Sequence, residues 1–115
     1  MTLNRILPEE LNEKLKNKEK VFILDVRAEE KYKNFHIEDS SIKSIHIEKT
    51  DIFNLDENQQ DAINSLPKKK EIIVTCTTGN SAAKCAVILS ERGYDVAVLE
   101  GGLTAWKKFK EEAVD

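Results

Sequence analysis

The sequence is poor in the residues that mark several specialised classes of protein. Its 115 residues include two cysteines, two prolines and four glycines, and no apolar run is longer than five residues. Two cysteines are too few for a disulfide framework, and they lack the Cys-x-x-Cys or Cys/His spacing of a metal site. A membrane-spanning helix needs about 18 consecutive apolar residues, so no such span is expected. The N-terminal residues also lack the apolar stretch of a signal sequence, so we expect a reduced, cytoplasmic protein.

Positive charge is not in excess either. The chain has 18 Lys and Arg against 21 Asp and Glu, a formal net charge of -3. Nucleic-acid binding normally needs a basic excess, so nucleic acid is not an expected partner. The length falls within the usual size of one domain, and the apolar content of 40% is enough to bury a core. We therefore expect one domain spanning residues 1–115.

The apolar pattern predicts helices that alternate with strands. A helix is expected to begin at Pro8, because Leu7, Leu11 and Leu15 recur at helical spacing and acidic residues fill the first turn. Further helices are expected at 28–34, 51–66, 82–91 and 103–110, and strands at 21–26, 41–47, 72–75 and 96–99. The strands are apolar throughout instead of alternating with polar residues. This combination predicts an α/β fold with a central, mostly parallel β-sheet flanked by helices on both faces.

A cysteine stands where such a fold binds its ligands. Cys76 follows the strand at 72–75, and ligands of parallel sheets bind at the carboxyl ends of the strands. The loop after it leads into a helix, whose free N–H groups and dipole favour an anion and therefore the reactive thiolate. Gly79 lets this loop turn sharply. Cysteine is also often buried as an inert small hydrophobe, so composition alone leaves both interpretations open.

Three segments of the chain, taken together, resemble the single-domain rhodanese family of sulfurtransferases. They are Leu24-Asp25-Val26-Arg27 with Glu29-Glu30-Lys31-Tyr32 and His36-Ile37, then Cys76-Thr77-Thr78-Gly79-Asn80-Ser81, then Gly93-Tyr94-Asp95-Val96 with Leu99-Glu100-Gly101-Gly102-Leu103-Thr104-Ala105-Trp106. The second segment matches the family's loop, Cys-x-x-Gly-x-[Arg/Ser]. The resemblance covers nearly the whole chain, and the order and spacing of the segments make it specific.

The resemblance implies a rhodanese-like fold and a persulfide mechanism. Cys76 would take the outer sulfur of thiosulfate or a related anionic donor and pass it to cyanide, a thiol or a protein acceptor. Neither a metal nor an organic cofactor would be needed. The persulfide would be held by the loop residues Thr77, Thr78, Gly79, Asn80, Ser81 and Ala82. The alternative is a non-catalytic rhodanese-like module that binds a partner or carries sulfur; the intact cysteine and loop favour catalysis.

The loop departs from its relatives at one position and differs from phosphatases at another. Its sixth residue is Ser81, where the family often has Arg, so we expect weaker affinity for thiosulfate. Phosphatases related to this fold use a Cys-x5-Arg loop, but Ala82 stands at that position and the next arginine is Arg92. Without that guanidinium, transition-state charge on phosphate would be poorly compensated. Phosphatase activity is therefore not expected.

Four further residues allow a functional and a structural interpretation. Asp25 and Arg27 are supporting candidates that either bind substrate or tie loops together by ion pairing, and the second role is favoured. Cys85 is either a resolving thiol for Cys76 or a buried core residue, and the core is favoured. His36 is interpreted as structural because nothing in the sequence brings it near Cys76.

Overall fold

The chain forms one parallel sheet with helices around it. The computed structural model describes residues 3–55 and 63–112. Within them, five strands pair in the order β1-β5-β4-β2-β3, all parallel. The strands are β1 (Asn4–Ile6), β2 (Val21–Asp25), β3 (Ile42–His46), β4 (Ile72–Thr75) and β5 (Val96–Leu99). The helices are α1 (Pro8–Lys16), α2 (Glu29–Asn34), α3 (Lys49–Phe53), α4 (Asn80–Glu91) and α5 (Gly102–Glu112). The predicted α/β fold with a parallel sheet is confirmed.

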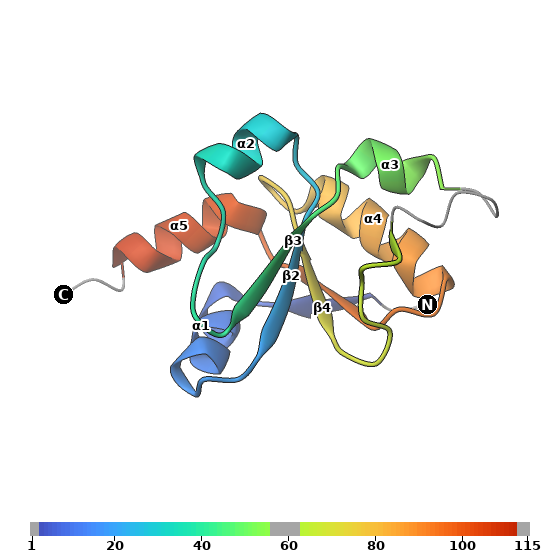
Figure 1. Cartoon of the computed structure of the whole chain (residues 1–115). Helices are drawn as coiled ribbons and strands as arrows, with labels where there is room; N and C mark the ends of the chain where they lie inside the picture. The colour runs from blue at the N-terminus through green and yellow to red at the C-terminus, as the bar shows by residue number, and fades with distance from the viewer. Residues whose placement is uncertain (1–2, 56–62, 113–115) are drawn as a thin grey trace.

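Each face of the sheet carries its own hydrophobic cluster. Ile72 and Val74 of β4 pack in one cluster with residues of α3 and α4. Ile73, between them, points to the other face and packs with residues of α1 and α5. Figure 1 shows these two pairs of helices on opposite sides of the sheet. The alternation explains why the strands are apolar throughout, since both faces are covered. None of the helices in the described ranges is long and apolar enough to cross a membrane.

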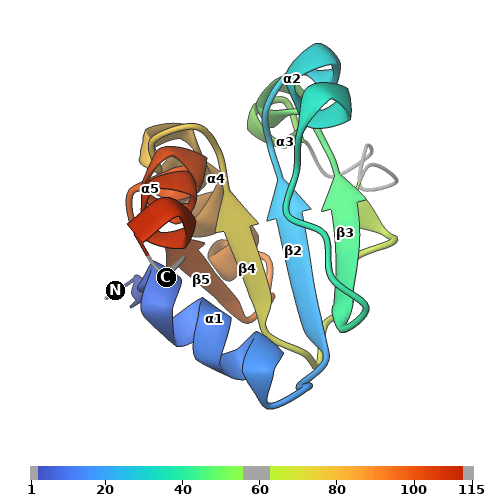
Figure 2. The same ribbon diagram turned by 90° about the vertical axis from the view of Figure 1, so that its left-hand side faces the viewer.

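The parallel strands β2 and β4 are neighbours in the sheet, and the chain adds its next strand on opposite sides of them. From β2 the chain continues to β3 on one side, and from β4 it continues to β5 on the other. In open parallel sheets, the crevice at the carboxyl ends of two such strands is the usual place for a ligand. Asp25 pairs with Thr75 at these ends, so the next residues, Val26 and Cys76, leave the sheet side by side. The arrowheads in Figure 2 point to this edge, where α2 and α3 also lie.

Two predictions about secondary structure are wrong. No strand was expected before the first helix, yet β1 pairs with β5 at the edge of the sheet. One helix was expected over 51–66, but α3 ends at Phe53 and Leu55 is outside any helix. Residues 56–62 of that prediction lie outside the described residues. Asn54, a poor helix former, ends α3, and Ile52, Ile63 and Leu66 reach the same core cluster without a continuous helix.

Candidate active site

The Cys76 sulfur lies at the amino end of α4 and accepts two backbone hydrogen bonds. The N–H of Gly79 donates to Sγ at 3.0 Å and that of Ala82 at 3.4 Å. Ala82 is in the first turn of α4, where backbone N–H groups have no partner within the helix. Gly79 has φ +100°, a left-handed conformation that few other residues adopt. Two N–H dipoles and the helix end therefore stabilise a negative charge on this sulfur.

The start of α5 fixes the shape of the Cys76 loop from the other side. The N–H of Leu103 donates to the carbonyl of Cys76 at 2.9 Å, and that of Thr104 donates to the carbonyl of Thr77 at 3.0 Å. Gly102 lies so close that a Cβ there would stand 2.5 Å from the Cys76 oxygen. A side chain at this position would therefore push the loop away. This contact gives a physical reason for the glycine at position 102, far from Cys76 in sequence.

A small cavity opens in front of the cysteine. Its volume is about 190 Å³, below the roughly 300–1,000 Å³ of sites for drug-sized ligands. Its lining comes from three regions of the chain: Val26, Arg27, Ala28 and Lys31, then Lys49, then Cys76, Thr77, Thr78 and Ser81. Of the loop residues predicted from sequence, Thr77, Thr78 and Ser81 line the cavity, while Gly79 and Ala82 contact the sulfur. Asn80 is exposed and begins α4.

Asp25 and Arg27 form the ion pair that was favoured from sequence. The Arg27 Nη2 lies 2.6 Å from Oδ2 of Asp25, and its Nε lies 2.9 Å from Oδ1. The side chains are only 2% exposed for Asp25 and 9% for Arg27. Nη2 of Arg27 also donates to the carbonyl of Phe35. The guanidinium is thus held by the protein itself, and it ties β2 to the end of α2.

Sequence reasoning missed Lys31 of α2 and Lys49 of α3 as cavity residues. Both line the cavity with Cys76, although 45 and 27 positions separate them from it in the chain. The N–H of Lys49 donates to the carbonyl of Val26 at 2.9 Å, which fixes the start of α3 beside the cavity. Lys31 stood inside one of the segments that carried the resemblance, but no spacing marked either residue. Only the folded chain brings them to the cysteine.

Cys85 is a core residue, as expected. It is fully buried on α4, one helical turn after Ala82, and the structure records both cysteines as free thiols. Burial raises the pKa of the Cys85 thiol from its ordinary 9.0 to about 12; the nearby Cys76 adds to this rise and Lys49 opposes it. A thiol that stays protonated at neutral pH is a poor nucleophile. The favoured interpretation of Cys85 as a core residue is confirmed.

The two histidines have structural contacts away from the cysteine. The His36 ring stacks on Tyr32 at 4.0 Å, and its Nδ1 lies 2.8 Å from the Tyr32 carbonyl, which confirms the structural interpretation. His36 lines a larger groove of about 650 Å³ beside α5, and neither cysteine lines this groove. His46, which no sequence pattern marks as functional, lies with Nε2 2.7 Å from the carbonyl of Arg27. It therefore helps to fix the backbone that leads into the cavity.

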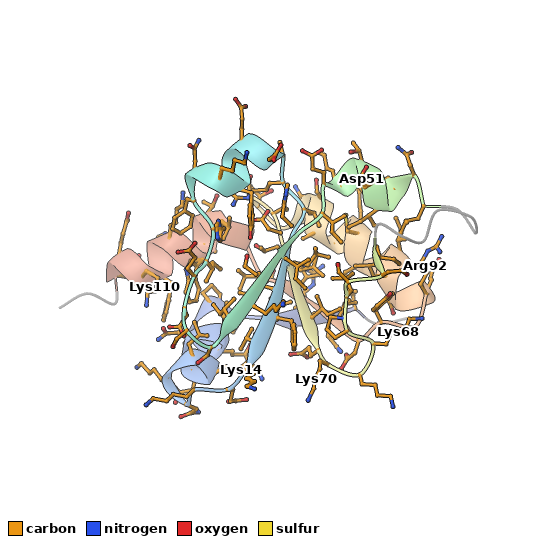
Figure 3. The ribbon with its side chains drawn as sticks, viewed as in Figure 1. Lys14, Asp51, Lys68, Lys70, Arg92 and Lys110 are labelled. Carbon is orange, nitrogen blue, oxygen red and sulfur yellow. The ribbon has the colours of Figure 1, made fainter. Side chains whose placement is uncertain are left out.

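Arg92, the next arginine after the Cys76 loop, lies far from that loop. Arg92 follows the last residue of α4, so a helix of about 18 Å at 1.5 Å per residue separates it from the loop. Figure 3 shows it at the end of α4 near Lys68, and its Nη2 donates to the carbonyl of Leu55 at 3.3 Å. No group of three or more His, Cys, Asp and Glu residues in the described ranges could hold a metal ion.

Comparisons with known proteins agree with this fold. The family model described as "Rhodanese-like domain" matches residues 7–109. The "Putative sulfurtransferase YtwF" of Bacillus subtilis (strain 168) is 27% identical over 107 residues, which cover 93% of each chain. The crystal structure of a rhodanese-like domain protein from Staphylococcus aureus has a TM-score of 0.76 and 29% identity, covering 90% of this chain and 91% of that one.

A second solved structure relates the fold to sulfur chemistry in a larger protein. An NAD-dependent persulfide reductase from A. fulgidus has a TM-score of 0.65 and 31% identity, covering 90% of this chain but 16% of that one. The family model, the B. subtilis relative and this structure together support membership of a sulfur-transfer family. With a matching family model over nearly its whole length and the parallel sheet of its structural neighbours, the chain belongs to the rhodanese-like domain family.

Proposed function

We propose that this chain is a sulfurtransferase that carries sulfane sulfur as a persulfide on Cys76. The observation that carries the proposal is the environment of the sulfur. Sγ accepts hydrogen bonds from two backbone N–H groups at the amino end of α4 and lies beside a cavity lined by cations. Such an environment favours a thiolate and holds the anionic persulfide that follows.

The proposed reaction has two displacement steps. The Cys76 thiolate attacks the outer sulfur of thiosulfate; the sulfur–sulfur bond of the donor breaks, and its electron pair leaves with sulfite. Cys76 then carries the outer sulfur as an anionic persulfide. In the second step an acceptor such as cyanide or a thiolate attacks that outer sulfur, and the electron pair of the persulfide bond returns to Cys76. Both steps conserve charge and need neither an oxidant nor a cofactor.

The size of the cavity and the need for a reduced cysteine also bear on the sulfur acceptor and on the cellular compartment. The small volume of the cavity, about 190 Å³, suits cyanide or the end of a longer thiol, including a thiol on a partner protein. The chemistry requires a reduced Cys76, so we place the protein in a reducing compartment such as the cytoplasm. The B. subtilis and S. aureus relatives match over 93% and 91% of their own lengths, which supports a protein that works as one domain.

The test is the intact mass of the reduced protein before and after incubation with excess thiosulfate. We expect a gain of one sulfur atom that cyanide removes as thiocyanate. Cys76→Ser should gain nothing. Cys85→Ser is the matched control, because it removes the other thiol and should still gain the sulfur.

The same experiment separates catalysis from a binding module. Sulfur gain by Cys76→Ser would contradict the mechanism. If the wild type gains no sulfur from thiosulfate, the measurement is repeated with a persulfide of a small thiol. Failure with both donors would overturn the enzyme proposal and favour a module that only binds a partner.

A further inference from the structure

Among the residues that the structure describes, the lining of the cavity beside Cys76 contains positively charged side chains but no negatively charged one. In the described part of the chain, its lining includes three cationic side chains, Arg27, Lys31 and Lys49, and no acidic one. The loop itself contributes no charge, since Ser81 stands at its sixth position. Any positively charged side chain that a donor meets near the sulfur therefore comes from outside the loop.

The three cations are not equivalent. The guanidinium of Arg27 is committed to the buried carboxylate of Asp25, which neutralises it. Among the described residues, neither Lys31 nor Lys49 has a carboxylate partner. The free positive charge of the cavity is thus carried by two lysines. They come from different elements, α2 and α3, which both lie at the carboxyl edge of the sheet (Figure 2).

The charge of Lys49 reaches Cys85, the buried thiol behind the cavity. Its backbone N–H is fixed to the carbonyl of Val26, the residue that leaves β2 beside Cys76. Lys49 also lowers the pKa of Cys85 against the larger effect of burial, and Cys85 lies one turn of α4 below Ala82. An ammonium group that affects this buried thiol also lies near the cavity where the outer sulfur of a persulfide would stand.

We infer that Lys31 and Lys49 together form the anion-binding pair of the Cys76 cavity, and that this pair supplies the positive side-chain charge that the loop itself lacks when an anionic donor binds. The inference rests on the proposed function and names the residues that would bind its anionic donor. The two ammonium groups bind the sulfonate oxygens while the outer sulfur faces Sγ. As the donor bond breaks, charge grows on the departing sulfite, and the same two groups stabilise it. The small cavity admits such an anion whole.

The first test reads the charge of the cavity without any sulfur transfer. Cys76 is alkylated with iodoacetate, which is anionic, or with iodoacetamide, which is neutral and of similar size. The ratio of the two rates reports the local charge. We expect Lys31→Gln and Lys49→Gln each to lower this ratio about fivefold, the effect of one unit charge a few ångströms away. Lys49→Arg should keep it.

Two matched variants control for net charge. Lys33→Gln removes a lysine on α2 that is paired with Glu29, and Lys43→Gln removes an exposed lysine on β3; neither lines the cavity. Both should leave the ratio unchanged. If Lys31→Gln and Lys49→Gln also leave it unchanged, the anion-binding pair is ruled out. Because the neutral reagent measures access to the thiol in every variant, a disturbed fold would not be mistaken for a lost charge.

The second test measures sulfur transfer from thiosulfate. The double variant Lys31→Gln/Lys49→Gln should raise KM by more than tenfold, and its rate should depend less on salt than that of the wild type. An unchanged KM in the double variant would overturn the role of Lys31 and Lys49 in binding the donor. If the wild type itself transfers no sulfur from thiosulfate, the proposed donor is wrong, while the alkylation ratio still decides whether the two lysines form an anion site.

Discussion

The Cys76 cavity is built by backbone on one side and by long side chains on the other. The floor, which we define as the loop from Cys76 to Ser81, is held by backbone hydrogen bonds to the starts of α4 and α5. The rim, which we define as Lys31 and Lys49, consists of exposed side chains on the short helices α2 and α3. α2 buries none of its residues.

The floor and the rim therefore contribute to the site in two different ways. Backbone groups on the floor are fixed by packing, so they can stabilise charge on the sulfur without reorganising. Flexible lysines on the rim lose rotamer freedom when they bind an anion, but their replacement costs little stability. We therefore expect changes that reach the floor to affect folding and activity together, and changes at the rim to affect activity alone. The following substitutions test that division.

The largest effect is expected at the buried ion pair of Asp25 and Arg27, which ties β2 to the end of α2. Asp25→Ala leaves the nearly buried guanidinium of Arg27 without its carboxylate. Removing one partner of a buried pair costs about 3–5 kcal/mol. Urea unfolding followed by circular dichroism should show this loss, whereas Lys43→Gln on the exposed side of β3 should stay within about 0.5 kcal/mol of the wild type. A small loss for Asp25→Ala would mean that the pair contributes little to holding β2 to the end of α2.

The next effect is expected where α5 contacts the loop. Gly102→Ala places a Cβ 2.5 Å from the Cys76 oxygen and 2.6 Å from that of Thr77, at a φ of +61°. Gly93→Ala is the matched control, because its φ is +93° but no atom lies within 4 Å of the new Cβ. Left-handed strain alone costs about 1–2 kcal/mol, so Gly93→Ala should lose that much and Gly102→Ala more. Only Gly102→Ala should also slow alkylation of Cys76; equal behaviour would contradict the contact.

A smaller effect is expected when a positive charge is added to the floor. Ser81 lines the cavity from the second residue of α4. Ser81→Arg adds a guanidinium that can bind an oxoanion through two N–H groups, so KM for thiosulfate should fall several-fold. Ser81→Gln, a polar residue without charge, is the control and should not lower KM. An unchanged KM in Ser81→Arg would indicate that the rim already supplies the charge that the donor needs.

The smallest effect concerns Cys85, which lies under the floor. Burial raises the pKa of Cys85 to about 12, whereas the unfolded chain ionises near 9.0. Its contribution to stability is therefore complete below pH 9 and is lost progressively as the pH rises towards 12. The gap in the free energy of unfolding between the wild type and Cys85→Ala should narrow between pH 8 and about pH 10.5. A gap that does not change with pH would show that Cys85 ionises in the folded chain as easily as in water.

Much of the fold was readable from local patterns. The runs at 72–75 and 96–99 coincide with β4 and β5, because an apolar run bounded by polar turns has one stable place in a parallel sheet. The prediction of one continuous helix over 51–66 is wrong, although it also rested on a local apolar pattern. Ile52, Ile63 and Leu66 do enter the core, but α3 ends before Asn54, and the spacing of apolar residues does not show where a helix ends. β1 has three residues and depends on its pairing with β5, a contact that no local pattern contains.

The candidate site also combines features that the local sequence determines with features that depend on the tertiary structure. The sequence by itself determined the position of Cys76 between a buried strand and a helix, and with it the anion-stabilising backbone of the loop. Only the tertiary structure decided that Arg27, Lys31 and Lys49 line the cavity at that cysteine and that Arg27 is neutralised by Asp25. The reason is physical. Loop geometry depends on neighbours in the chain, whereas the charge that surrounds the sulfur depends on which strands pair, in which order and in which register.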